Sequence, residues 1–76
     1  MKPTNKPNEI KGARSRLGLT QKYMADGLGL SEASYGKKER GEVEFTFAEV
    51  PQVARMLGLS WKQVNDFFFD GEMPNP

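Results

Sequence analysis

The 76 residues of this chain are enough for one compact domain and too few for two, because domains rarely contain fewer than about 50 residues. The sequence has no cysteine and no histidine, which removes disulfides, thiolate or imidazole metal ligands and most acid–base chemistry near neutral pH. We therefore expect no metal, no cofactor and no enzymatic activity. The longest apolar run, Phe67 to Phe69, is too short for a membrane span, and the N-terminus lacks a signal-peptide core, so we expect a cytoplasmic protein.

Charge is distributed unevenly along the chain, although the formal net charge is only +1. Residues 1–41 contain nine basic and four acidic side chains, a net charge of +5. Residues 42–76 contain two basic and six acidic side chains, a net charge of −4. The first half is therefore the candidate surface for a nucleic acid.

Five helices are predicted, because apolar residues recur with helical rather than alternating spacing between turn and cap residues. They are expected to form one all-α domain over residues 9–69, with a flexible basic arm at 1–8 and a flexible tail at 70–76. The first helix should run from about Asn8 to Leu17, with Ile10, Ala13 and Leu17 on one buried face.

Two short helices separated by a glycine turn are predicted next. Thr20 should cap a helix over Gln21–Leu28, which ends at Gly29. Ser31 should cap a helix over roughly Glu32–Arg40. Two short helices joined by a tight turn cross steeply and leave the outer face of the second exposed, and such a helix fits the major groove of DNA.

The last two helices are predicted from their cap residues. In the segment from Thr46 to Glu49, hydroxyl and carboxylate can satisfy each other's backbone donors, and a helix should follow as far as Met56 or Leu57. Pro51 is tolerated there only in the first turn. The core stripe of that helix is Val50, Val53, Ala54 and Leu57. Ser60 should cap a final helix from Trp61 to about Phe68.

Three consecutive phenylalanines close the predicted domain. Successive helical residues diverge by about 100°, so at least one of these rings is expected to be exposed. In the favoured interpretation Phe68 and Phe67 close the core and Phe69 folds back beyond the helix end. Alternatively, Trp61 and Phe69 form an interface with a second copy or another protein.

The ordered set of residues resembles the lambda-repressor-like, or Xre/Cro-type, helix-turn-helix family over about residues 9–69. The resemblance rests on Arg14, Gly18-Leu19-Thr20-Gln21, Ala25, Gly29, Lys38-Glu39-Arg40-Gly41 and residues 54–60. It implies a compact five-helix domain that binds a double-stranded DNA operator and regulates transcription in a bacterial host cell, as in the lysis/lysogeny switch of a bacteriophage. It also implies a buried ion pair between Arg14 and Glu39, with Tyr35 turned into the core.

The same resemblance assigns the residues that contact DNA. They are Gln21, Ser31, Glu32, Ala33, Ser34, Lys37, Lys38 and Arg40. Lys37 is suited to guanine, Glu32 to cytosine or simply to the helix dipole, and Ala33 to a thymine methyl group. Gln21, Lys38 and Arg40 are suited to phosphates, which position a protein on DNA without specifying sequence.

The segment Glu42–Phe45, which follows the predicted DNA-reading helix, departs from the family pattern. It is acidic where DNA-binding relatives are often basic. This departure supports an alternative hypothesis, an antirepressor that forms a heterocomplex with a phage repressor by imitating phosphate charge. The residues predicted for this interface are Tyr23, Glu42, Glu44 and the pair Phe45 and Phe47, and Trp61 and Phe69 complete the predicted protein-contact residues. A homodimer is the other expected assembly, because two copies can bind half-sites about one helical turn apart.

Overall fold

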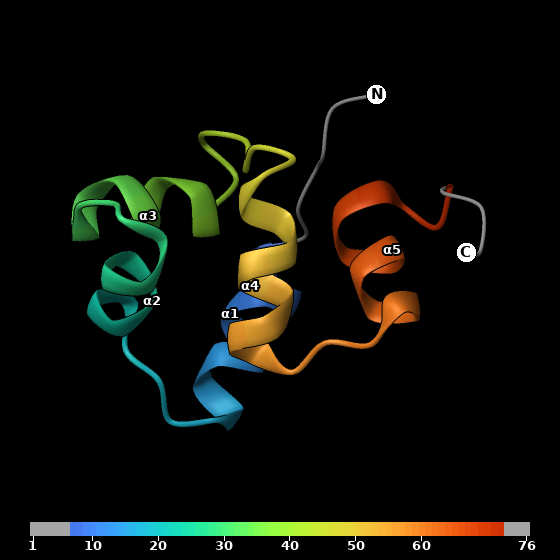
Figure 1. Cartoon of the computed structure of the whole chain (residues 1–76), viewed down its shortest axis with the longest axis horizontal. Helices are drawn as coiled ribbons and strands as arrows, with labels where there is room; N and C mark the ends of the chain where they lie inside the picture. Colours follow the sequence, from blue (N-terminus) through green and yellow to red (C-terminus); the bar gives the residue numbers. More distant parts are fainter. Residues whose placement is uncertain (1–6, 73–76) are drawn as a thin grey trace.

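The computed structural model describes residues 7–72. This part of the chain folds into five helices joined by loops and contains no strand (Figure 1). They are α1 (Pro7–Arg16), α2 (Gln21–Leu28), α3 (Glu32–Glu39), α4 (Glu49–Leu57) and α5 (Trp61–Phe69). The predicted all-α, five-helix fold is confirmed. Residues 1–6 of the predicted arm and 73–76 of the predicted tail lie outside the described residues, whereas residues 7–8 already belong to α1.

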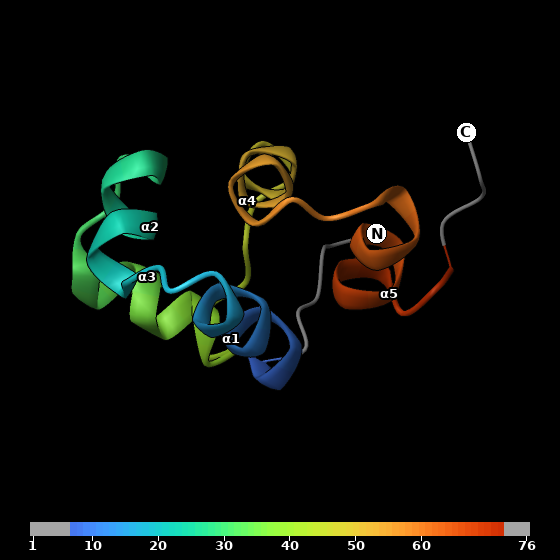
Figure 2. The same ribbon diagram turned by 90° about the horizontal axis from the view of Figure 1, so that it is seen from below.

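The helices are arranged with α2 and α3 at one end of the molecule and α5 at the other, and α1 and α4 lie between them (Figures 1 and 2). Helix α2 packs most extensively on α3 and also contacts α4, while α1 contacts α3. The longest dimension of the molecule is 32 Å. This arrangement separates the α2–α3 pair from the C-terminal helix.

Local hydrogen bonds explain where the helices begin and end. The hydroxyls of Thr20, Ser31 and Ser60 accept backbone N–H groups in the first turns of α2, α3 and α5, as predicted. Thr46 and Glu49 form the predicted reciprocal pair. The backbone N–H of Thr46 donates to the Glu49 carboxylate at 2.8 Å, and the backbone N–H of Glu49 donates to the Thr46 hydroxyl at 3.1 Å.

The core is built on a group of aromatic rings between the two ends of the molecule. Phe45 packs against Tyr35 at 6.2 Å and edge-on against Phe68 at 5.6 Å between ring centroids. Around them lie the fully buried side chains of Ile10, Met24 and Val53. These contacts join α1, α2, α3, α4 and α5 through the loop that carries Phe45, so the loop between α3 and α4 is part of the core.

Two expectations about apolar residues are wrong. Leu17 is 54% exposed, because α1 ends at Arg16 and the chain turns before the next repeat of its buried face. All three phenylalanines are buried, and Phe69 is the last residue of α5 rather than part of a fold-back. More than one side of α5 is covered, since Phe45 packs on Phe68 and Phe47 stacks on Phe69. None of the helices within residues 7–72 has the length and apolar character needed to cross a membrane.

Candidate nucleic-acid interface

The outer face of α3 is exposed at the positions that the sequence predicted. Glu32, Ala33, Ser34 and Lys37 are all exposed, whereas Tyr35 is fully buried, as expected. Ser31 caps the helix, and its hydroxyl lies 2.9 Å from that of Ser34. The helix therefore presents a short row of small and charged side chains to solvent while its aromatic residue anchors it to the core.

A buried polar network fixes α3 to α1 and α2. Glu39 accepts from Arg14 Nε at 2.7 Å and Nη2 at 3.1 Å, which confirms the predicted ion pair. Glu39 also accepts from the Tyr35 hydroxyl at 2.8 Å and from Gln21 Nε2 at 3.1 Å. Arg14 Nη1 in turn donates to the Leu19 carbonyl at 2.8 Å. One carboxylate thus joins three helices and sets the orientation of the exposed face of α3.

The network controls the protonation of its members. Burial would raise the pKa of Glu39, but hydrogen bonds from Arg14, Gln21 and Tyr35 lower that pKa below its ordinary value. The hydrogen bond to Glu39 raises the pKa of Arg14, and burial raises the pKa of Tyr35. The ion pair is therefore charged across the physiological range.

Two of the predicted phosphate ligands are engaged inside the protein. Lys38 is buried, and its Nζ lies 2.6 Å from Glu49 Oε1 and 5.9 Å from the centre of the Phe45 ring. The ammonium group of Lys38 thus joins α3 to α4, and this pairing argues against the predicted contact of Lys38 with phosphate. Gln21 is half-buried and donates its side-chain amide to Glu39, and its contact with phosphate stays a prediction.

Arg40 remains exposed but has an acidic neighbour. Its Nε donates to the Glu42 carboxylate, and the two side chains are about half exposed. The hydrogen bond from Arg40 lowers the pKa of Glu42. The acidic segment after α3 therefore neutralises its nearest cation, while Glu44 stays exposed.

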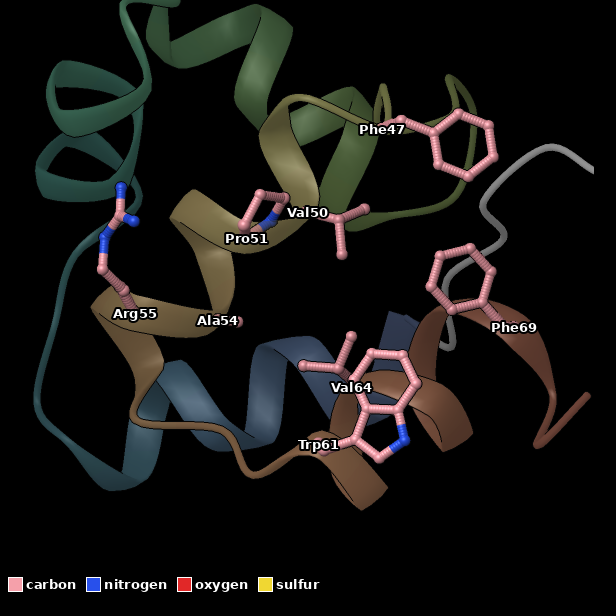
Figure 3. A pocket seen from close by; sticks show the side chains of 8 residues that line it. All are labelled: Phe47, Val50, Pro51, Ala54, Arg55, Trp61, Val64 and Phe69. Atoms are coloured by element: carbon pink, nitrogen blue, oxygen red, sulfur yellow. The ribbon is translucent and has the colours of Figure 1, made fainter. Parts of the chain in front are cut away.

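An apolar groove of about 500 Å³ lies between α4 and α5, away from α3 (Figure 3). Its lining residues are Phe47, Val50, Pro51, Ala54, Arg55, Trp61, Val64 and Phe69. Phe47 is 55% and Trp61 39% exposed, and Phe47 stacks on Phe69 at 6.0 Å between ring centroids.

The groove revises the predicted protein interface. Phe45 belongs to the core and Phe69 is nearly buried, so neither is the exposed contact that was expected, although Phe69 lines the groove. Trp61 is partly exposed and lines the groove, and Tyr23 is exposed on α2 outside it. Phe47, predicted together with Phe45, is the exposed member of that pair and lines the groove, whereas Arg55 was not predicted.

Comparison with known proteins places the fold in a family. Residues 10–64 match the model of the helix-turn-helix family, which is more than half of the chain. The chain therefore belongs to this family, in its lambda-repressor-like form.

One curated relative is YonR, an uncharacterized helix-turn-helix-type transcriptional regulator derived from the SPbeta prophage of Bacillus subtilis (strain 168). It is 34% identical over 62 residues, which cover 82% of this chain and 54% of the relative. The chain thus spans about half the length of this relative.

Solved structures show the same fold. The restriction-modification controller protein C.AhdI from Aeromonas hydrophila is similar with a TM-score of 0.67 at 22% identity, over 76% of this chain and 88% of that one. The clp gene regulator ClgR from C. glutamicum gives 0.66 at 24% identity, over 76% and 75%. A transcriptional regulator of the HTH_3 family from Vibrio cholerae gives 0.63 at 32% identity, over 78% of this chain and 33% of that one.

Proposed function

We propose that this chain binds double-stranded DNA through the outer face of α3 and thereby regulates transcription. The observation that carries the proposal is that the two sides of α3 lie in different environments. Its inner side is fixed by the Glu39 network, while Ala33, Ser34 and Lys37 on its outer side remain exposed. A rigid helix with a free outer face is the element that helix-turn-helix proteins place in the major groove.

We assign different roles to the exposed residues. Ser31, Glu32, Ala33, Ser34 and Lys37 are placed to meet base edges, and Lys37 supplies the charge for guanine. Arg40 is placed for phosphate, and Lys38 is left out of the interface because it is paired with Glu49. YonR and the Vibrio cholerae protein, both named as transcriptional regulators, support this proposal.

A pair of lysine substitutions tests DNA binding. Lys37→Ala should lower affinity for a site selected from random-sequence duplexes and relax sequence preference at the base that Lys37 contacts. The matched control is Lys62→Ala, which removes the same charge from the exposed surface of α5 at the other end of the molecule. Equal effects of the two substitutions, or no binding to any duplex by the wild type, would contradict the proposal.

We further propose that the α4–α5 groove, defined above by its eight lining residues, binds the same groove of a second copy. Charged side chains flank the apolar groove. Arg55 lines it and is exposed near the end of α4, whereas Asp70 and Glu72 are exposed beyond the end of α5. A two-fold axis across the groove brings each basic end to the partner's acidic end, as a self-complementary interface requires. It also leaves both α3 helices exposed.

Sedimentation of two serine variants tests the dimer. Phe47→Ser should shift the wild-type dimer to monomer, because Phe47 is the most exposed ring of the groove. Val43→Ser is the control, since Val43 is 45% exposed but does not line the groove. A wild type that sediments as a monomer, or a Phe47→Ser protein that stays dimeric, would contradict the proposal.

The prophage origin of YonR supports our placing this chain in a phage regulatory switch. The antirepressor hypothesis is less well supported, because Phe45 lies in the core and Glu42 is paired with Arg40. Mixing this protein with the repressor encoded beside it tests that alternative. A complex formed without DNA, weakened by Glu44→Lys, would favour it over DNA binding.

A further inference from the structure

Gly36 is buried although it lies in the middle of α3, beside the exposed Lys37. The side chain of Arg40 covers Gly36. A Cβ atom built on Gly36 would lie 3.1 Å from Arg40 Nη1 and 3.8 Å from Gln21 Oε1. The Nη1 end of the Arg40 guanidinium therefore lies against the glycine, close to the side chain of Gln21 at the start of α2.

The opposite edge of the guanidinium is held by Glu42. Arg40 Nε donates to the Glu42 carboxylate. The backbone of Glu42 is itself fixed, because its N–H donates to the Lys37 carbonyl at 2.9 Å. Arg40 is thus confined between a glycine surface and an anchored carboxylate, although its side chain is about half exposed.

Arg40 is the C-cap residue of α3 and continues the row of exposed residues on this helix. Ala33, Lys37 and Arg40 follow one another at i, i+4 and i+7, a spacing that places them on one side of a helix. Arginine binds phosphate through two parallel N–H groups, and a long side chain that is already ordered loses less conformational entropy on binding. Arg40 is therefore oriented before any ligand arrives.

We propose that Gly36 and Glu42 are positioning residues that hold the Arg40 guanidinium ready for a DNA phosphate. This inference rests on the proposed function, because it assumes that α3 faces a duplex. It gives a reason for a glycine at an interior helix position, where alanine is the more favourable residue. It also gives a role to an acidic residue at the edge of a DNA-binding surface, where repulsion alone would weaken binding.

Simple electrostatics and positioning make opposite predictions for Glu42. If Glu42 only repels phosphate, Glu42→Ala strengthens DNA binding by a similar factor whether or not Arg40 is present. If Glu42 masks Arg40, the gain is larger in the wild type than in an Arg40→Ala background. If Glu42 positions Arg40, the substitution weakens binding several-fold in the wild type and strengthens it in the Arg40→Ala background.

The experiment is a fluorescence titration of a mixed-sequence DNA duplex at low salt, which detects phosphate contacts without knowledge of the operator. We expect Glu42→Ala to reduce the salt slope by about 0.9, as the loss of one phosphate contact requires. Glu44→Ala is the matched control, because it removes the same charge from an exposed residue nearby, and it should not reduce the slope. Additive effects of Glu42→Ala and Arg40→Ala, or a larger gain in the wild type, would overturn the proposal.

Gly36→Ala gives an independent measurement. The added methyl group would lie against Arg40 Nη1 and displace the guanidinium, so DNA binding should weaken several-fold while the thermal midpoint stays unchanged or rises. In the Arg40→Ala background the same substitution should leave affinity unchanged. An unchanged affinity of Gly36→Ala in the wild type would count against positioning. A wild type that binds no duplex would refute the proposed function and this inference together, whereas the outcomes above refute the inference alone.

Discussion

Replacing Arg14 with methionine should destabilise the domain by about 3 kcal/mol, because the Glu39 carboxylate would stay buried without its counter-charge. The Glu39 side chain is only 3% exposed, and it accepts two hydrogen bonds from Arg14. Removing one partner of a buried pair costs about 3–5 kcal/mol. The lower end applies here, since Tyr35 and Gln21 continue to donate to the carboxylate.

Urea unfolding followed by circular dichroism measures this loss. A domain of 76 residues has a free energy of unfolding of roughly 4–11 kcal/mol, so the effect is large enough to resolve. The Arg14→Met/Glu39→Gln double variant should recover part of the loss, because glutamine still accepts from Tyr35 and carries no charge. A cost below about 1 kcal/mol for Arg14→Met, or strict additivity in the double variant, would refute the reasoning.

The pH dependence provides a second readout of the same pair. The pKa of Glu39 is lowered in the folded state, so its contribution is present above the unfolded value of about 4.3 and is lost as pH falls through the folded value. In the Arg14→Met variant only the neutral donors Gln21 and Tyr35 oppose the effect of burial on Glu39, so the pKa of Glu39 should rise. The wild type should therefore lose more stability than the variant between neutral and acidic pH, and parallel curves would contradict this.

Three further substitutions test other parts of the structure. Lys38→Met should lower stability by about 1–3 kcal/mol through the loss of the pair with Glu49 and leave the DNA affinity of the folded protein nearly unchanged; a selective loss of affinity would restore Lys38 to the interface. Gly12→Ala should stabilise α1 by about 0.5–1 kcal/mol in thermal unfolding, since the new methyl group meets only the end of the Arg16 side chain. Gly58→Ala should destabilise the domain by about 1–2 kcal/mol, because the φ of Gly58 is 66°. An unchanged thermal midpoint of either glycine variant would be evidence against the explanation given for it.

Helix limits were predictable from the sequence because they depend on neighbours in the chain. Ser31 and Ser60 each accept a backbone N–H three residues later, and Gly29 and Gly58 end α2 and α4 with positive φ. Such contacts need no knowledge of the rest of the fold. The ion pair between α1 and α3 was predictable only through the family resemblance, since its partners lie 25 residues apart.

The tertiary structure decided which of several similar residues face the solvent. Lys37 and Lys38 are adjacent cations of α3, but Lys38 turns toward α4 and is paired while Lys37 is exposed. Phe45 is buried and Phe47 exposed in the same loop, two residues apart. Sequence alone established the helices, their caps and the α2–α3 unit. Burial depends on how distant elements pack, and only that packing separated the core residues from those left for DNA or a partner.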